Sequence, residues 1–342
     1  MGPAPLTRPL LPGLLALLLS GCAPVSEHKI AGRTMGTTYH VTVVTRGPVS
    51  GLQEKIDQRL EEIERSLSTY REESEISRFN RFSRVGEEFR VSDDFLQVMR
   101  AGARVFALSG GAWDGTVRPL VDLWGFGPPG AAPGAPPADE IAARLGDVGF
   151  QKIEIRETGA LVKRQASVTV DLSSIAPGYG VDQVADLTRR EGFSRFIVEI
   201  GGEVYAAGSR RDGRAWRVGI GRPRADAAPD DVYRVAPLRD AAFSTSGDYR
   251  AFFVRDGVRY SHVLDPRTGR PVSNGVVSVS VRAPDCTLAD GLSTAVMVMG
   301  AESGLALLER LEGVEGLVVV ETKDGRLEDH ASSGFRSEPP PQ

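Results

Sequence analysis

The sequence has 342 residues, of which 41% are hydrophobic and 25% charged, a composition typical of a globular protein with one large domain or two closely packed ones. The formal net charge of -4 offers no positive surface of the kind that nucleic acids require, so we expect no nucleic-acid partner.

Residues 1–21 have the features of a lipoprotein signal peptide. Arg8 supplies a positive charge, and the apolar segment at residues 10–19 is short for a helix that spans a bilayer. The sequence LSGC at residues 19–22 resembles the lipobox of bacterial lipoproteins, whose cysteine receives the lipid. We therefore expect Cys22 to anchor the chain to the bacterial cell membrane, facing the periplasm or the cell exterior. The alternative is an ordinary cleaved signal followed by an incidental cysteine.

Lipidation of Cys22 leaves Cys286 as the other cysteine of the chain, so no internal disulfide is expected. With no histidine nearby in the sequence to activate it, Cys286 is better interpreted as a small buried hydrophobic residue than as a reactive thiol.

The hydrophobic pattern predicts both helices and strands after a tether at residues 22–31. A strand rich in β-branched residues is predicted at 37–45, and helices at 52–67 and 92–108 flank a polar loop at 72–84. Residues 127–138 consist mainly of Gly, Pro and Ala and predict a loop. Residues 167–172 alternate apolar and polar side chains like a strand, and a helix over residues 181–187 follows.

The second half of the chain predicts more strands than helices. Asp256-Gly257 is a hairpin signal between two of the strands, and residues 331–342 are expected to be a disordered tail because they are polar and rich in proline. The intermingled pattern predicts an α+β fold with mixed, largely antiparallel sheets and packed helices. The strands are predicted at residues 196–200, 216–220, 232–235, 252–254, 258–261, 276–281 and 316–320, and the helices at 288–298 and 303–311.

The stretch DLSSIAPGYGVD at residues 171–182 is a candidate phosphate-binding segment. Gly178 and Gly180 permit positive φ and close backbone approach, and a helix that starts there presents free N–H groups to an anion. This pattern favours a nucleotide ligand, but an ordinary strand-to-helix turn is an alternative on this evidence alone.

Two further groups of residues are suited to catalysis. Asp290 and Thr294 are four residues apart, so on a helix they project from one face and suit Mg²⁺ when phosphate and carbonyl oxygens complete the site. A helix cap is the alternative. His262 lies at the end of a hairpin strand, where a histidine can act as a general base or have a structural role. None of the four histidines has the spacing of a zinc site.

Eight separated segments, in order, resemble the ApbE family of FAD:protein FMN transferases. The resemblance extends from about residue 32 to about residue 320 and implies an ApbE-like domain over residues 32–330, with two intimate subdomains. The segments are RTMGTTY from residue 33, LSTYREESEISRFN from 67, GGAWDGTVRPLVDLWGFG from 110, DLSSIAPGYGVD from 171, VEIGGEV from 198, STSGDY from 244, YSHVLDPRTGRPV from 260 and ADGLSTAVMVMG from 289.

The resemblance implies a magnesium-dependent enzyme that splits FAD, attaches FMN through a phosphoester to a threonine or serine of an acceptor protein, and releases AMP. The implied acceptors are membrane-associated redox proteins, and His262 is implied as the base for their hydroxyl group. Matching positions imply a metal site formed by the carbonyl of Ala176, the carboxylate of Asp290 and the hydroxyl of Thr294. The implied contacts with the flavin or the rest of the ligand are Met35, Tyr70, Ala112, Trp113, Asp114, Asp171 and Ser173.

The chain departs from the family pattern at two of these segments. Pro177 stands where many members have lysine, which removes one cationic phosphate contact and predicts a tuned activity; Trp113 stands where phenylalanine is common. The segment DGLSTAV from residue 290 ends in Val296 where a self-flavinylated acceptor needs a hydroxyl. Two alternatives stay open: a magnesium-dependent FAD pyrophosphatase that gives free FMN and AMP, and a non-catalytic FAD-binding lipoprotein.

Overall fold

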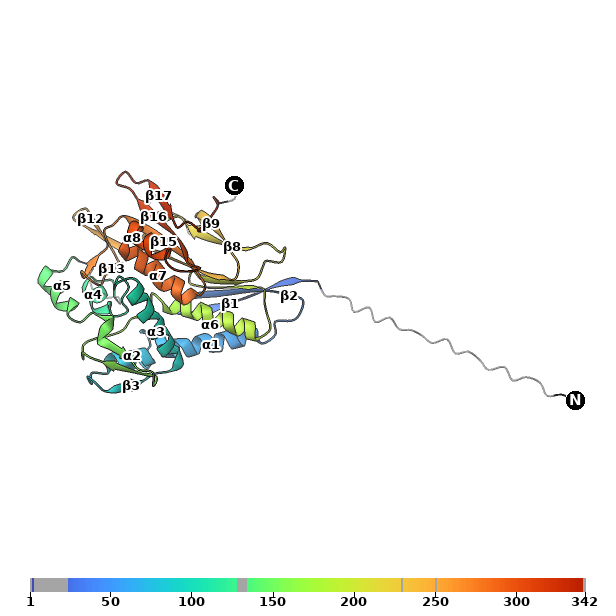
Figure 1. Ribbon diagram of the computed structural model, residues 1–342, viewed down its shortest axis with the longest axis horizontal. Coiled ribbons are helices and arrows are strands. Elements are labelled where there is room, and N and C mark those ends of the chain that lie inside the picture. Colours follow the sequence, from blue (N-terminus) through green and yellow to red (C-terminus); the bar gives the residue numbers. More distant parts are fainter. Residues whose placement is uncertain (1, 3–23, 128–133, 229, 250, 341–342) are drawn as a thin grey trace.

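The computed structural model describes residues 2, 24–127, 134–228, 230–249 and 251–340 (Figure 1). Cys22, the predicted signal peptide apart from Gly2, and residues 128–133 of the predicted loop lie outside the described residues. Within these described ranges, no helix is both long enough and apolar enough to cross a membrane.

An eight-stranded sheet in which every neighbouring pair is antiparallel forms the centre of the molecule. Its second strand shows the alternation of a strand with one buried face. Tyr39, Val41 and Val43 are buried in the core, whereas His40, between the first two, is exposed. The strands, in spatial order, are β1 (Ser26–Thr34), β2 (Thr37–Thr45), β6 (Phe196–Ile200), β7 (Glu203–Ala207), β10 (Ala241–Gly247), β15 (Val276–Ala283), β16 (Glu315–Glu321) and β17 (Leu327–Ala331).

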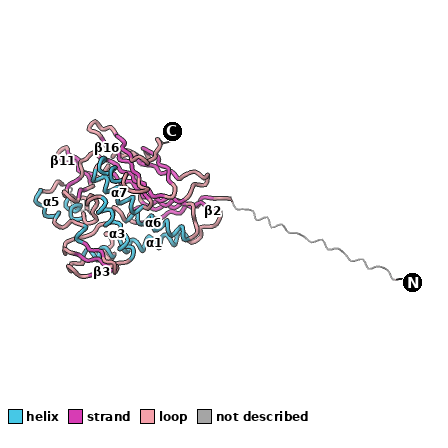
Figure 2. Tube along the Cα trace, viewed as in Figure 1, coloured by secondary structure: helices cyan, strands magenta, loops and turns pink. Residues whose placement is uncertain are grey.

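Helices build the main core together with one face of this sheet, as the separation of helices and strands in Figure 2 illustrates. The central one is buried on nearly all sides and packs against β10 and β15, so polar side chains on it are held inside the protein. The helices are α1 (Leu52–Leu67), α2 (Glu75–Arg81), α3 (Asp93–Leu108), α6 (Ala176–Arg190), α7 (Cys286–Met299) and α8 (Ala301–Leu308), of which α7 is the central one.

A second core covers the other face of the sheet. There the hairpin of β8 (Trp216–Gly221) and β9 (Val232–Leu238) packs with Phe243 and Phe335. Phe335 is 8% exposed, and Glu338 pairs with Val235 through the backbone. The sequence predicted disorder from residue 331 onward, but this described part of the tail is ordered, because one aromatic anchor outweighs the polar and proline-rich composition around it.

The remaining elements surround the helical side of the molecule. Asp256 and Gly257 have φ of 52° and 75° and close a two-residue hairpin, as the sequence predicted. These elements are α4 (Arg118–Leu123), α5 (Ala138–Leu145), the 3₁₀ turn Phe150–Lys152, the three-stranded sheet β3 (Glu88–Arg90), β5 (Ala160–Lys163) and β4 (Ile153–Ile155), the pair β11 (Phe252–Arg255) and β12 (Val258–Ser261), and the pair β13 (Leu264–Asp265) and β14 (Arg270–Pro271).

The prediction of an α+β fold with largely antiparallel sheets is confirmed, and three local predictions are wrong. Part of the predicted tether belongs to β1, and the predicted loop at 72–84 contains α2, which Ser74 caps by accepting from Ser77 N at 3.1 Å. Residues 167–172 are not a strand: Val170 is buried, but its N–H and carbonyl pair with the Asn80 side chain at 2.7 and 2.8 Å instead of with a neighbouring strand.

Candidate functional site

Two adjoining cavities bring the separated sequence segments together. The first has a volume of about 440 Å³ and the second about 550 Å³, and Tyr70, Asp171 and Ser173 line both. The first is also lined by Arg118, Glu203, Ser246, His262, Asp290 and Thr294, and the second by Met35, Glu64, Ala176 and Pro177.

The segment at residues 171–182 forms the boundary between the cavities and the start of α6. Asp171 accepts from Ser173 N at 3.0 Å and from the Arg118 guanidinium at 2.9 Å, which fixes the loop before the helix. Pro177 lies in the first helical turn, where its missing N–H leaves no helix hydrogen bond broken.

The expected role of the two glycines is wrong. Gly178 and Gly180 lie inside α6, and neither has positive φ. They are needed for close packing, because a Cβ on Gly178 would lie 2.4 Å from the carbonyl oxygen of Cys286, and one on Gly180 would lie 2.9 Å from Cε of Met35.

Asp290 lies where α7 crosses the first turns of α6. It is 4% exposed, and Gly178 N donates to its Oδ2 at 3.0 Å. Thr294 follows one turn later, and its Oγ1 lies 3.2 Å from Ser246 Oγ. Both line the first cavity, whereas the cap of α7 is Asp285, which accepts from Leu288 N at 2.8 Å. The two residues therefore share one face as the sequence predicted, and the alternative reading of Asp290 as a helix cap is wrong.

Two carboxylates share the first cavity without a cationic partner among the described residues. Burial raises the pKa of Asp290 to about 7, and burial together with the charge of Asp290 raises the pKa of Glu203 well above its usual range. A bound hard cation would offset both effects. No three His, Cys, Asp or Glu side chains in the described ranges form a metal site, so a cation beside Asp290 needs the Thr294 hydroxyl and further oxygens from the backbone or the ligand. That donor set is of the kind Mg²⁺ accepts. Ala176, whose carbonyl was the third predicted ligand, lines the second cavity and not the first.

His262 follows β12 and presents one ring nitrogen for chemistry. Its Nδ1 donates to the carbonyl of Ala251 at 2.9 Å, so the neutral ring keeps its lone pair on Nε2. The Phe126 ring contacts it edge to face with centroids 6.4 Å apart. Burial lowers the pKa of His262, which favours the neutral form that can accept a proton.

The residues expected to contact the ligand fall into two groups. Met35, in the β1–β2 turn with φ of 49°, and Tyr70, which is 88% exposed, line the cavities together with Asp171 and Ser173. Ala112, Trp113 and Asp114 are buried and line neither cavity.

The buried group supports the loop below the cavities. Trp113 is 1% exposed, and its Nε1 donates to Ser174 Oγ at 2.9 Å. The Asp114 carboxylate accepts from the backbone and hydroxyl of Thr116 at 2.8 and 2.6 Å and from Phe150 N at 3.0 Å. These side chains have their partners inside the fold, so they are positioned to shape the site and not to stack on a ligand.

Sequence reasoning missed two charged residues of the first cavity. Glu203 lies in the segment VEIGGEV, directly after a tight turn at the start of β7, and Arg118 lies in the segment that follows Trp113. Both segments were part of the family resemblance, but the sequence alone does not show that Glu203 lies near Asp290 or that Arg118 pairs with the distant Asp171.

The geometry defines an α+β protein with a ligand site of two linked cavities, one acidic and equipped with a neutral histidine. The model of the ApbE family matches residues 35–318. The FAD:protein FMN transferase of Vibrio cholerae is 44% identical over 324 residues, covering 94% of this chain and 95% of the relative. That of Haemophilus influenzae is 36% identical over 330 residues, covering 94% of each.

Solved structures agree with the sequence comparison. The flavin transferase ApbE from Vibrio cholerae superposes with a TM-score of 0.82 at 43% identity, covering 91% of this chain and 99% of that one. The chain belongs to the ApbE family.

Proposed function

We propose that the protein is a magnesium-dependent FAD:protein FMN transferase. It cleaves the pyrophosphate of FAD, joins FMN through a phosphoester to a threonine or serine hydroxyl of an acceptor protein, and releases AMP. The names of the relatives support the flavin and the protein acceptor. The observation that carries the proposal is that His262, whose Nδ1 is engaged by the Ala251 carbonyl, lines the same cavity as Asp290 and Thr294 of α7.

His262 and the acceptor hydroxyl begin the reaction. Nε2 takes the hydroxyl proton as the oxygen attacks the phosphorus of the FMN half, and the bond between that phosphorus and the oxygen bridging to the AMP phosphate breaks. AMP leaves with the bonding electron pair. The Ala251 carbonyl stabilises the imidazolium that forms, because it accepts the hydrogen bond from Nδ1.

The chain's other residues bind and orient the FAD. Tyr70, exposed between the two cavities, offers its ring to the flavin, and Met35 lines the wall of the second cavity. Arg118 faces the first cavity, where it lies within reach of phosphate charge although it is held by Asp171. Asp290, Thr294 and the Ala176 carbonyl would hold Mg²⁺, which would neutralise the charge of the pyrophosphate.

The test incubates the full chain with FAD, Mg²⁺ and a peptide that carries the family's threonine acceptor motif. Covalent flavin on the peptide, measured by mass spectrometry, supports the transferase. Free FMN and AMP without labelled peptide would instead identify the FAD pyrophosphatase, in which water replaces the acceptor hydroxyl. Unchanged FAD that stays bound would identify a carrier and contradict catalysis.

The membrane location is a separate part of the proposal. The LSGC sequence supports a lipid on Cys22, which would tether the enzyme on the periplasmic or outer side of the cell membrane, next to membrane-associated redox proteins that accept FMN. The variant Cys22→Ala should move the protein from the membrane fraction to the soluble fraction, and a variant that stays with the membrane would contradict the anchor.

A further inference from the structure

We propose that Asp182 is a positioning residue, which locks α7 against α6 and thereby places Asp290 and Thr294 for the metal. The inference rests on the proposed function, since it concerns the same metal site. Asp182 touches neither cavity of that site, so it acts only through α7.

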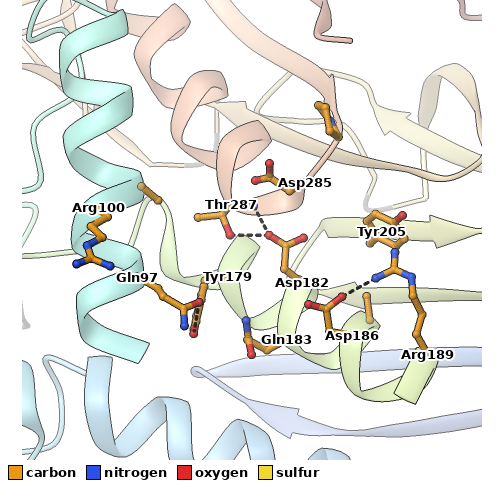
Figure 3. A pocket seen from close by; sticks show the side chains of 13 residues that line it. Gln97, Arg100, Tyr179, Asp182, Gln183, Asp186, Arg189, Tyr205, Asp285 and Thr287 are labelled. Carbon is orange, nitrogen blue, oxygen red and sulfur yellow. Dashed lines mark hydrogen bonds and ion pairs between the residues drawn. The ribbon is translucent and has the colours of Figure 1, made fainter. Parts of the chain in front are cut away.

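The Asp182 carboxylate ties the first turn of α7 to the middle of α6. It accepts from Cys286 N at 2.7 Å, from Thr287 N at 2.8 Å and from Thr287 Oγ1 at 2.5 Å. Figure 3 shows its side chain reaching from α6 toward Thr287 at the beginning of α7. All three donors belong to α7, and the acceptor belongs to α6, so these bonds join two helices.

A second polar contact between the same helices lies one turn away. Gly178 N donates to Asp290 Oδ2 at 3.0 Å. Positions 178 and 182 are one turn apart on α6, and positions 286 and 290 are one turn apart on α7. Because 178 contacts 290 and 182 contacts 286, the two helices are antiparallel where they meet. Two contacts one turn apart prevent both sliding and rotation of α7, which one contact alone would not do.

Close packing makes the placement of Asp290 sensitive to this register. Gly178 has no side chain, so α7 can approach closely. A Cβ at position 178 would lie only 2.4 Å from the Cys286 carbonyl oxygen and 2.8 Å from the Cβ of Asp290. If the Asp182 contact is lost, α7 can shift only outward from α6. Asp290 then moves away from the first turn of α6, which its carboxylate contacts through Gly178 N.

Asp182 does more than cap α7 locally. The helix has its own cap in Asp285, which accepts from Leu288 N at 2.8 Å and has its backbone just outside α7. A ligand-binding role for Asp182 is not favoured either. It borders a cavity of about 480 Å³, but its carboxylate is already engaged with three donors, and Arg189 on the same cavity wall pairs with Asp186 at 2.6 Å.

The test compares Asp182→Asn with Asp285→Ala in the full chain. The asparagine keeps one acceptor oxygen but sets its NH₂ group against an N–H donor of α7, so at least one of the three bonds is lost and the bridge between the helices is weakened. Asp285→Ala instead weakens the same end of α7 without touching α6. Binding of Mn²⁺ alone is measured by electron paramagnetic resonance, with thermal unfolding as a check on folding. We expect Asp182→Asn to weaken Mn²⁺ binding by about tenfold, the usual effect of losing a residue that orients a metal ligand, and Asp285→Ala to leave it within about twofold.

A second readout separates positioning from loss of folded protein. With Asp182→Asn, the Mg²⁺ concentration that gives half-maximal transfer should rise by a similar factor of about ten, while the rate at saturating Mg²⁺ stays within about threefold of the wild type. A smaller amount of folded enzyme would lower the rate at every Mg²⁺ concentration. If Asp182→Asn does not fold, Thr287→Val removes one donor, and an unchanged Mn²⁺ affinity in that variant would overturn the inference.

Asp290→Ala distinguishes failure of this inference from failure of the proposed function. If Asp290→Ala loses Mn²⁺ binding while Asp182→Asn binds like the wild type, Asp182 has no positioning role and the metal site stands. If neither variant changes Mn²⁺ binding or the Mg²⁺ dependence of turnover, both the metal site and the positioning role are wrong.

Discussion

Asp290 and Asp114 are both buried aspartates on segments that resemble the same family, and the structure gives them opposite roles. Asp114 accepts three internal hydrogen bonds, and it lines neither cavity of the site. Asp290 accepts one, from Gly178 N, and faces a cavity beside a second carboxylate. The difference teaches that burial alone does not mark a functional carboxylate. A buried carboxylate with unused acceptor positions, open to a cavity, is the one arranged for a ligand.

Replacing Asp290 should have the largest effect on turnover. Asp290→Ala removes the carboxylate of the metal site, so we expect magnesium-dependent transfer to fall below detection in an assay of AMP release. The fold should keep its stability or gain a little, because burial that raises the pKa of Asp290 to about 7 also makes its ionised form unfavourable in the folded state. A variant with full magnesium-dependent activity would show that the metal assignment is wrong.

Removing the base should have the next largest effect. His262→Gln keeps a polar group beside the Ala251 carbonyl but cannot take the hydroxyl proton, so kcat should drop by roughly 10²- to 10⁴-fold. FAD binding, measured by flavin fluorescence quenching, should change little. A loss of binding equal to the loss of rate would indicate that the histidine holds the substrate instead of accepting a proton.

The pH profile distinguishes His262 from Asp290. Burial lowers the pKa of His262, so the active neutral form persists below pH 6.5, and at saturating Mg²⁺ the rate should fall only under that value. At low Mg²⁺ the fall should begin nearer pH 7, because protons compete with the metal for Asp290. Raising the Mg²⁺ concentration should therefore move the acid limb to lower pH. An acid limb that does not move would show that Asp290 does not bind the metal.

Asp114→Ala should affect stability more than chemistry. It leaves the donors of Thr116 and Phe150 without their acceptor, which should lower the free energy of unfolding by about 3 kcal/mol. Denaturant unfolding measures the free energy of unfolding of Asp114→Ala and, for comparison, of Asp290→Ala. If Asp114→Ala loses FAD turnover without losing stability, Asp114 contributes to the ligand site and not to the fold.

The sequence predicted the long helices and four of the eight strands of the central sheet because their periodicity reports which face is buried. The helix at 52–67 and the strands at 37–45 and 196–200 have the predicted bounds. It failed where side chains replace regular pairing, as at Val170, whose backbone pairs with Asn80 from a distant segment.

For the site, the family resemblance identified residues that converge on the cavities, including Tyr70, His262 and Asp290. It could not tell which aromatic residue faces the ligand. Tyr70 is exposed and Trp113 is buried, although both follow helices in polar and aromatic clusters. It also missed Glu203, because the proximity of Glu203 to Asp290 arises from the packing of β7 against α7, two elements far apart in the sequence.

Pro177→Lys should produce the smallest effect, and one that is confined to substrate binding. Pro177 lines the second cavity in the first turn of α6, where a lysine would bring a positive charge toward the phosphates of bound FAD. The same charge is unfavourable at a helix N-terminus by roughly 0.3–1 kcal/mol, so the net gain should be modest: a KM for FAD lower by about threefold, with kcat within about twofold. Pro177→Ala is the control, since it restores a backbone N–H without adding charge.

Salt should abolish the difference in KM between the two variants, because exposed charges are screened over about 10 Å at 0.1 M. If both variants lower KM equally, the freed N–H at the helix start is responsible, and the missing cation has no part in how this chain binds its substrate.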